Sequence, residues 1–225
     1  MLILVLGKGK TGSLVAQVAR ARGHGVRVLD FNENRDASAL TAPALAGIDV
    51  VIDFTNAQAA LKNIPAVLSV GARIVVGTTG WYTHLNEMKA LAIKRGGGLL
   101  YGTNFSIGVQ KLFRLTAELA QLDGYQFSIS ETHHESKLDA PSGTAITLQQ
   151  IVEAAQPGAK VEITSHRVGD AKGEHIVTAT SDVDILEIRH DAHSRRGFAV
   201  GAVRAAEWLD GKSGAWDFRE IFDQL

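Results

Sequence analysis

One loop of this sequence concentrates side chains that can exchange protons or bind anions. His133 and His134 are neighbours, and Lys137 follows four residues after the first of them. Histidine can act as a general acid near neutral pH, and lysine can supply positive charge or a proton. Residues 141–144 then open a predicted helix, whose first N–H groups suit a carboxylate. The combination points to acid–base chemistry on a small dianion.

Two plainer interpretations of this loop stay open. A zinc site could use His133, His134 and Glu135, but adjacent residues rarely ligate one metal with good geometry. The chain also has no His-Glu-x-x-His motif. Alternatively, the loop is a solvated polar connection that binds nothing. We expect no metal here and expect the loop to serve acid–base chemistry.

A second motif, near the start of the chain, is typical of nucleotide binding. Residues 7–12 read Gly-Lys-Gly-Lys-Thr-Gly, after an apolar run and before helical spacing. Such glycines allow a tight turn and a close approach to a pyrophosphate at the helix N-terminus. An acidic residue, Asp30, ends the next predicted strand, where a carboxylate binds ribose hydroxyls. The alternative is a glycine-rich turn in an unrelated protein. The predicted dinucleotide site comprises Gly7, Lys8, Gly9, Lys10, Thr11, Gly12 and Asp30.

The residues around Asp30 bear on the choice of cofactor. Its carboxylate would repel the 2′-phosphate of NADP, and Phe31 stands where an arginine would favour that phosphate. Lys8 and Lys10 act in the opposite direction, because a lysine in this loop could reach a 2′-phosphate. We therefore expect NADH to be preferred and NADPH to be tolerated.

Small residues also follow the fourth predicted strand. Gly77, Thr78 and Thr79 precede Gly80, at the carboxyl edge where Rossmann-type sheets bind ligands. They would let a nicotinamide ring approach closely. Taken alone, the stretch is more typical of an ordinary turn.

The elements that carry these motifs alternate between strand and helix through the first part of the chain. Short apolar runs predict strands, and apolar residues three and four apart predict helices. This alternation implies right-handed crossovers and a parallel, Rossmann-type sheet. Strands are predicted at residues 2–6, 26–29, 50–52 and 73–76, and a further one from residue 99 onward. A first helix is predicted to follow Gly12 and to be stopped by Gly23 and Gly25, and two more helices are predicted at 57–68 and 84–95.

After Asn104 the pattern changes to consecutive strands with few helices between them. Consecutive strands predict an antiparallel or mixed sheet, hence a smaller α+β domain. We expect a dinucleotide-binding domain over residues 1–104 and a substrate-binding and oligomerisation domain over 105–195. A closing helix over about 196–225 packs back on the first domain. Predicted helices are 109–121, 145–155 and 198–209, and predicted strands are 126–131, 161–166, 175–180 and 185–190.

Composition excludes several classes of protein. The 225 residues are 45% hydrophobic and 21% charged, as in ordinary globular chains. No apolar run is long enough for a transmembrane helix, and a signal peptide is not expected at Met1. The absence of cysteine excludes disulfides and thiolate chemistry, and a net charge of −1 argues against nucleic-acid binding. We expect a cytoplasmic protein without membrane contact.

The loop from Glu131 to Ala145 reads Glu-x-His-His-x-x-Lys-x-Asp-Ala-Pro-Ser-Gly-Thr-Ala. It closely resembles the signature of the dihydrodipicolinate reductase family, also called 4-hydroxy-tetrahydrodipicolinate reductases. Other stretches agree, so the resemblance covers nearly the whole chain. They are residues 77–80, 104–109, 173–175 and 194–206.

The resemblance implies a Rossmann cofactor domain and a smaller mixed-sheet domain that builds a homotetramer. It implies NAD(P)H-dependent reduction of 4-hydroxy-tetrahydrodipicolinate, a cyclic dicarboxylate, in diaminopimelate and lysine biosynthesis. By this resemblance His133 is the acid–base residue and Lys137 the proton donor. The residues implied to bind substrate are His134, Gly143, Thr144 and Arg195, and those implied to line the nicotinamide are Gly102, Thr103, Asn104 and Phe105.

The chain departs from the family pattern at the cofactor loop. The family usually has Gly-Arg-Met-Gly where this chain has Gly-Lys-Thr-Gly at residues 9–12, and often an arginine where Phe31 stands. Both departures bear on whether the chain prefers NADH or NADPH. The competing readings are an aspartate or homoserine dehydrogenase and a regulator that binds NAD without turnover.

Overall fold

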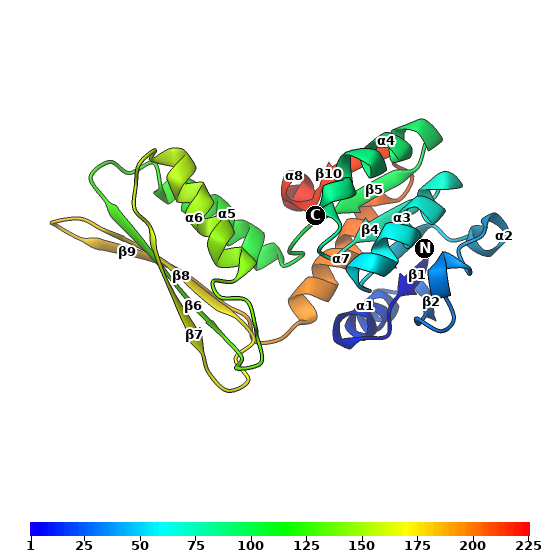
Figure 1. Ribbon diagram of the computed structural model, residues 1–225, viewed down its shortest axis with the longest axis horizontal. Coiled ribbons are helices and arrows are strands. Elements are labelled where there is room, and N and C mark those ends of the chain that lie inside the picture. Colours follow the sequence, from blue (N-terminus) through cyan, green and yellow to red (C-terminus); the bar gives the residue numbers. More distant parts are fainter. The chain divides into compact units, whose positions relative to one another are not determined.

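The chain folds into two units, and the computed structural model describes them over residues 1–225 (Figure 1). The first unit comprises residues 1–106 and 196–225, and the second comprises residues 107–195. No helix in either unit combines the length and the apolar character needed to cross a membrane.

The first unit is built on a six-stranded sheet in which every neighbouring pair is parallel. Its order is β10-β5-β4-β3-β1-β2. The central strands are buried on both faces, which explains their continuous apolar runs. The strands are β1 (Leu2–Leu6), β2 (Gly25–Leu29), β3 (Val50–Asp53), β4 (Arg73–Val76), β5 (Gly98–Tyr101) and β10 (Gly214–Asp217).

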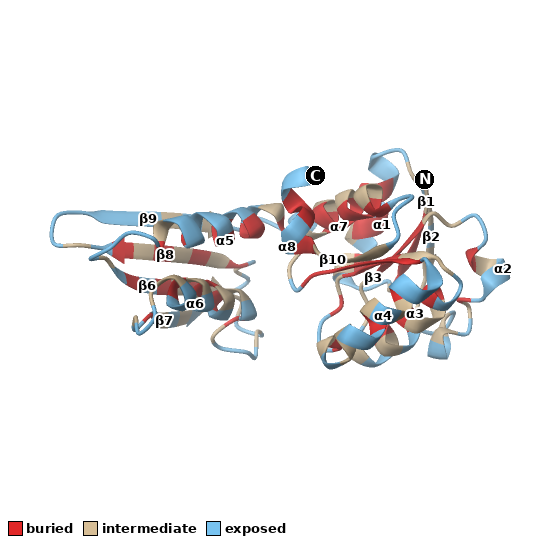
Figure 2. Cartoon of the chain, turned by 90° about the horizontal axis from the view of Figure 1, so that it is seen from above, coloured by how far each residue is buried: buried red, intermediate tan, exposed pale blue.

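Helices cover both faces of this sheet (Figure 2). On one face α1 (Lys10–Ala21) packs against α7 (Arg196–Leu209), and on the other α3 (Ala57–Ser69) packs against α4 (Leu85–Arg95). The predicted Rossmann-type parallel sheet is thereby confirmed. Short helical turns complete the unit: η1 (Arg35–Ala37), α2 (Ala42–Leu45), η2 (Tyr82–His84), α8 (Phe218–Ile221) and η3 (Phe222–Gln224).

Two expectations for the first unit are wrong in detail. The first helix begins at Lys10, so Gly12 lies buried inside its first turn; Gly23, with φ 84°, follows the helix, whereas Gly25 begins β2. The closing segment is also not one helix, because α7 ends at Leu209 and β10 then pairs with β5. Residues 214–217 are too short and too mixed in character for periodicity to identify a strand.

The second unit is a four-stranded mixed sheet in the order β7-β6-β8-β9. The β6–β7 pair is parallel, whereas β8 is antiparallel to both of its neighbours, which confirms the predicted mixed sheet. Two helices, α5 (Ile107–Leu119) and α6 (Gly143–Ala155), pack against each other and against the sheet (Figure 1). The strands are β6 (Gln126–His133), β7 (Glu162–Arg167), β8 (Glu174–Thr180) and β9 (Ile185–Asp191).

Alternation along β6 positions the chemistry of this unit. Phe127, Ile129 and Glu131 are buried, whereas Gln126 and Ser128 are exposed. Successive side chains of a strand point to opposite faces, so Glu131 continues the apolar row of the core. A carboxylate therefore stands where the pattern would place a hydrophobic residue.

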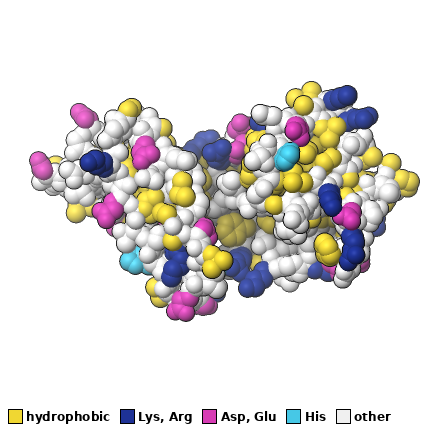
Figure 3. Space-filling view, in the orientation of Figure 1, with side chains coloured by type: hydrophobic (Ala, Val, Ile, Leu, Met, Phe, Trp, Pro, Cys, Tyr) yellow, Lys and Arg dark blue, Asp and Glu magenta, His cyan; other side chains and the backbone are white.

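Acidic and basic side chains are interspersed over the surface of both units on the face that Figure 3 shows. This distribution matches the net charge of −1. A broad surface of one sign, as nucleic-acid binders use, is not seen on this face.

Close packing at Gly201 of α7 gives a test of the first unit. A Cβ at Gly201 would overlap the carbonyl oxygen of Phe105, whereas a Cβ at Gly197 would have its nearest neighbour, Ser106 Oγ, at 3.8 Å. We expect Gly201→Ala to destabilise the unit by about 1–3 kcal/mol through overpacking. Gly197→Ala, the control in the same helix, should be neutral or stabilising by about 0.5–1 kcal/mol.

Urea unfolding followed by tryptophan fluorescence measures this difference. Trp81, Trp208 and Trp216 are the only tryptophans of the chain, and all three lie in the first unit. Equal midpoints for the two variants would contradict the packing argument.

Candidate functional site

In the first unit the predicted cofactor residues lie at one edge of the sheet. Parallel strands end at the same edge, so Gly7 after β1, Asp30 after β2, Gly77 after β4 and Gly102 after β5 are brought together there. Open sheets of this kind bind ligands at this edge.

The phosphate loop depends on two close backbone approaches. A Cβ at Gly12 would overlap the carbonyl oxygen of Gly7, and a Cβ at Gly7 would overlap that of Phe54. Gly7 also has a φ of 103°, which side-chain-bearing residues rarely adopt. Gly9 is the N-cap of α1, and Lys10 and Thr11 form its first turn. The loop thus presents the N-terminus of α1 without side chains in the way, which fits a pyrophosphate.

Lys8 is held by two carboxylates at the end of β2. Its Nζ lies 3.3 Å from Asp30 Oδ2 and 2.8 Å from Glu33 Oε2, and all three groups are partly exposed. The backbone N–H of Glu33, followed by Lys8 and the N–H of Asn32, lowers the pKa of Asp30, so this carboxylate stays ionised. The sequence analysis missed Glu33; an acidic residue three positions after Asp30 was the available signal.

A cavity of about 230 Å³ adjoins this cluster. Phe31, 62% exposed, stands at its wall, and the Arg35 guanidinium lies 5.5 Å from the centre of its ring. A flat aromatic surface beside ionised Asp30 fits the adenine and ribose of a dinucleotide. The cavity is lined by Leu6, Gly7, Lys8, Gly9, Leu29, Asp30, Phe31, Asn34, Phe54, Thr55, Ala59 and Asn63.

Asp53, the last residue of β3, is fully buried, and its hydrogen bonds hold the segments that follow β3 and β4 at this edge of the sheet. The sequence analysis missed this residue. Its Oδ1 accepts hydrogen bonds from Thr55 N at 2.9 Å and Thr78 Oγ1 at 2.8 Å, and its Oδ2 accepts one from Asn63 Nδ2 at 2.8 Å. Thr78 is therefore buried and engaged by Asp53, whereas Thr79 is exposed. Hydrogen bonding of this kind is what a buried polar group requires.

The segment after β5 is packed rather than open. The Phe105 ring meets Phe54 edge-on at 6.2 Å and lies 4.5 Å from the Phe218 ring. Asn104 Oδ1 accepts a hydrogen bond from Ser106 N at 2.8 Å. Gly102 has room for no side chain, since a Cβ would lie 2.9 Å from Phe218 Cβ. Thr103 between them is exposed, and the segment reaches the same edge as the phosphate loop.

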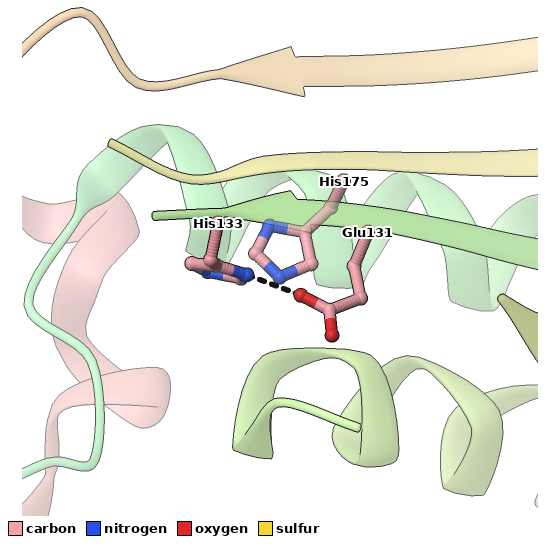
Figure 4. Close-up of side chains that lie close together, drawn as sticks. All are labelled: Glu131, His133 and His175. Atoms are coloured by element: carbon pink, nitrogen blue, oxygen red, sulfur yellow. Dashed lines mark hydrogen bonds and ion pairs between the residues drawn. The ribbon is translucent and has the colours of Figure 1, made fainter. Parts of the chain in front are cut away.

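In the second unit a group of titratable side chains lies close together near the end of β6 (Figure 4). Glu131 and His133 are two positions apart on β6, and His175 of β8 is the register partner of Glu131. All three therefore share one face of the sheet. His133 Nδ1 is hydrogen-bonded to Glu131 Oε2, and the His133 and His175 rings are 5.1 Å apart.

Burial sets the charge state of this group. Burial lowers the pKa of His133, although the adjacent Glu131 carboxylate opposes the shift. Burial opposes ionisation of Glu131 too, but hydrogen bonds, led by that from Arg167, outweigh it and lower its pKa. Burial lowers the pKa of His175 to about 3. At neutral pH the group is therefore an ionised carboxylate beside two neutral imidazoles.

The remaining loop residues are held by local hydrogen bonds. Lys137 Nζ contacts both carboxylate oxygens of Asp139, at 2.7 and 2.8 Å. Arg167 NH2 donates to Glu131 Oε1 at 3.0 Å, and its guanidinium also binds carbonyl oxygens of the loop. His134 Nδ1 is hydrogen-bonded to Ser136 Oγ at 2.8 Å. The sequence analysis missed Arg167 and Asp139 as members of this group.

The N-terminus of α6 is tied to the same group. Ser142 is its N-cap, and the Ser142 hydroxyl accepts from Ala145 N and contacts His175 Nε2 at 3.1 Å. Gly143 and Thr144 are the first two helical residues, as a carboxylate site at this terminus requires. Arg195 lies after β9, just before α7, and makes no hydrogen bond to the loop.

The groups near this loop that could hold a metal differ from the set His133, His134 and Glu135 that the sequence offers. Atoms of Glu131, His133 and His175 lie within 4.8 Å of one another. The Arg167 guanidinium already occupies one oxygen of Glu131, and its positive charge opposes a second cation. The expectation of no metal stays a prediction.

The family model for the dihydrodipicolinate reductase N-terminus matches residues 1–105, and that for the C-terminus matches residues 108–222. The chain belongs to the dihydrodipicolinate reductase family. Its members are NAD(P)-dependent oxidoreductases of diaminopimelate and lysine biosynthesis, so the protein is an enzyme that uses a nicotinamide cofactor and a small-molecule substrate.

Two relatives match over nearly their whole length. The 4-hydroxy-tetrahydrodipicolinate reductase of Christiangramia forsetii is 36% identical over 242 aligned positions, covering 100% of this chain and 99% of that protein. That of Natronomonas pharaonis is 34% identical, covering 98% and 99%. Dipicolinate-bound dihydrodipicolinate reductase from Paenisporosarcina sp. TG-14 has the same fold, with a TM-score of 0.82 at 22% identity and coverage of 100% and 99%.

Neutral, buried His175 predicts an acid-sensitive second unit. Its pKa is about 3 in the folded protein against an ordinary value of 6.5, so the unfolded chain takes up this proton first as the pH falls. The contribution of neutral His175 to the free energy of unfolding is fully present above about pH 6.5. It is lost as the pH falls towards 3, at up to about 1.4 kcal/mol per pH unit. His175→Asn should flatten this dependence.

Urea unfolding followed by far-UV circular dichroism between about pH 5 and pH 7.5 measures the slope. Exposed His166 on the same sheet supplies the control, because His166→Asn should keep the parent slope. A slope unchanged in His175→Asn would show that another group dominates.

Proposed function

We propose that this protein reduces 4-hydroxy-tetrahydrodipicolinate to tetrahydrodipicolinate, with NADH as its preferred cofactor. The observation that carries the proposal is the match to 4-hydroxy-tetrahydrodipicolinate reductases over 99% of their length. The bound nicotinamide supplies the hydride. This chain has to bind and orient both molecules and to manage the proton taken up with the hydride, while the 4-hydroxyl group of the substrate leaves as water.

The second unit supplies the residues for the proton. His133 is the acid–base residue of the proposal, and Lys137 is the proton donor. Asp139 holds the Lys137 ammonium in the loop through two hydrogen bonds. His134, Gly143 and Thr144 bind the substrate carboxylates in this proposal, because imidazole and helix-start N–H groups suit anions. Arg195 is proposed as a further ligand for a substrate carboxylate, although it makes no hydrogen bond to this loop.

The first unit supplies the cofactor site. The phosphate loop from Gly7 to Gly12 would hold the pyrophosphate, and Asp30 would bind the ribose hydroxyls of the adenosine. The predicted nicotinamide side comprises Gly77, Thr78, Thr79, Gly102, Thr103, Asn104 and Phe105. Asp30 and Glu33 share the single positive charge of Lys8, so the three groups carry a net negative charge beside the proposed ribose site, which favours NADH over a cofactor with a 2′-phosphate.

Two expectations about the cellular form go with this function. A homotetramer is supported by the open edge strand β9, where Ile185 is 65% exposed, since unpaired edges invite pairing. A cytoplasmic location is supported by the biosynthetic role. Native mass measurement and cell fractionation test these two points.

Turnover tests the reaction directly. Purified protein mixed with freshly generated 4-hydroxy-tetrahydrodipicolinate should oxidise NADH, followed by its absorbance. His133→Ala and Lys137→Ala should each slow this reaction by roughly 100-fold or more, because each removes a proton-transfer group. Tight NADH binding without turnover by the parent would overturn the proposal and favour a regulator that only binds the nucleotide.

The cofactor preference has its own test. Glu33→Gln removes one of the two carboxylates that hold Lys8, so the lysine becomes available to a 2′-phosphate. We expect the ratio of kcat/KM for NADPH to that for NADH to rise roughly twofold to fivefold, which corresponds to the free energy of one exposed ion pair. Asp36→Asn, in the same loop but paired with Lys62, is the matched control. Parent enzyme that prefers NADPH would contradict the assignment.

A further inference from the structure

Both oxygens of the buried Glu131 carboxylate are engaged, and one of them decides where His133 carries its proton. Oε2 meets His133 Nδ1, and Oε1 accepts from Arg167 NH2 at 3.0 Å. An ionised carboxylate can only accept hydrogen bonds, so the shared hydrogen belongs to Nδ1. In neutral His133 the lone pair is then on Nε2.

One backbone neighbour of His133 Nε2 is a glycine, which brings no side chain against this atom. Gly173 stands beside it, and a Cβ there would lie 3.1 Å from His133 Nε2. Gly173 has a φ of 136°, a conformation that side-chain-bearing residues rarely adopt. The Gly173-Glu174-His175 stretch therefore has a steric role at its first residue and supplies the neighbouring ring at its last.

Charged and titratable groups face His133 from four segments. Glu131 lies on its own strand, Arg167 on β7, His175 on β8 and Lys137 on the following loop. Glu131 raises the pKa of His133, whereas Lys137 and Arg167 lower it. Neutral His175 adds no charge at neutral pH. Glu131 is thus the one neighbour that favours proton uptake by His133.

We propose that Glu131 is a positioning residue for the reaction proposed above: it fixes the ring and tautomer of His133 so that Nε2 exchanges the proton. Arg167 completes the arrangement by holding the second oxygen of Glu131. The inference rests on the proposed function for its kinetic consequence, but the tautomer is a property of the protein alone.

The isosteric substitution Glu131→Gln makes a sharp test. Arg167 donates to this position and can only be met by the amide oxygen. The amide nitrogen then faces His133 Nδ1, which must accept. The hydrogen of neutral His133 moves to Nε2, and the negative charge that favoured protonation is gone. Glu131→Asp keeps the charge but shortens the side chain.

The experiment combines kinetics with nitrogen NMR of the histidine rings in the full chain. For Glu131→Gln we expect the His133 tautomer to invert and its pKa to fall by roughly one unit. We expect kcat to fall by roughly tenfold to 100-fold with a smaller change in KM. Glu131→Asp should retain the parent tautomer and a higher pKa. Exposed Glu153 of α6 provides the control, Glu153→Gln, which should match the parent.

The outcomes separate this inference from the proposed function. An unchanged tautomer and pKa of His133 in Glu131→Gln would overturn the positioning role, whatever the activity. If the parent shows no turnover but the His133 tautomer inverts in Glu131→Gln, the tautomer assignment stands and the proposed reaction is overturned. If Glu131 only filled space, Glu131→Asp would be at least as damaging as the isosteric Glu131→Gln, and that ranking would also contradict the proposal.

Discussion

A fully buried carboxylate in each unit must be met by hydrogen-bond donors, and meeting it brings together the segments that form the candidate sites. Asp53 at the end of β3 collects donors from Thr55, Thr78 and Asn63. Glu131 near the end of β6 is met by His133 and Arg167. A carboxyl group without hydrogen-bond partners in such positions would be costly, so these contacts constrain the surrounding loops.

The two carboxylates differ in what they position. Asp53 accepts hydrogen bonds from the backbone and from neutral side chains, so it fixes the shape of the sheet edge that carries the phosphate loop. Glu131 is bonded to a titratable ring, so it fixes a proton as well as a shape. The exposed trio of Lys8, Asp30 and Glu33 is different again, because its partners can be exchanged for a ligand at little cost.

Much of the fold was predictable because its signals are local. The parallel strands are continuous apolar runs, and the glycine pattern at residues 7–12 follows one of them directly. The mixed sheet followed from consecutive strands without long helices between them. The strand β10 was missed because four residues of mixed character acquire strand structure only by pairing with β5. Gly12 was placed outside the helix because its role is a backbone approach to Gly7, which no periodicity reports.

By itself the sequence determined the residue types available for chemistry, the cofactor motif and the family resemblance, since all of these lie in contiguous stretches. Tertiary structure alone decided which of these residues touch. Glu131 meets Arg167 from a strand 36 positions away, and Asp53 meets Thr78 across 25 positions. It also decided their charge states, because burial is set by packing from many segments at once.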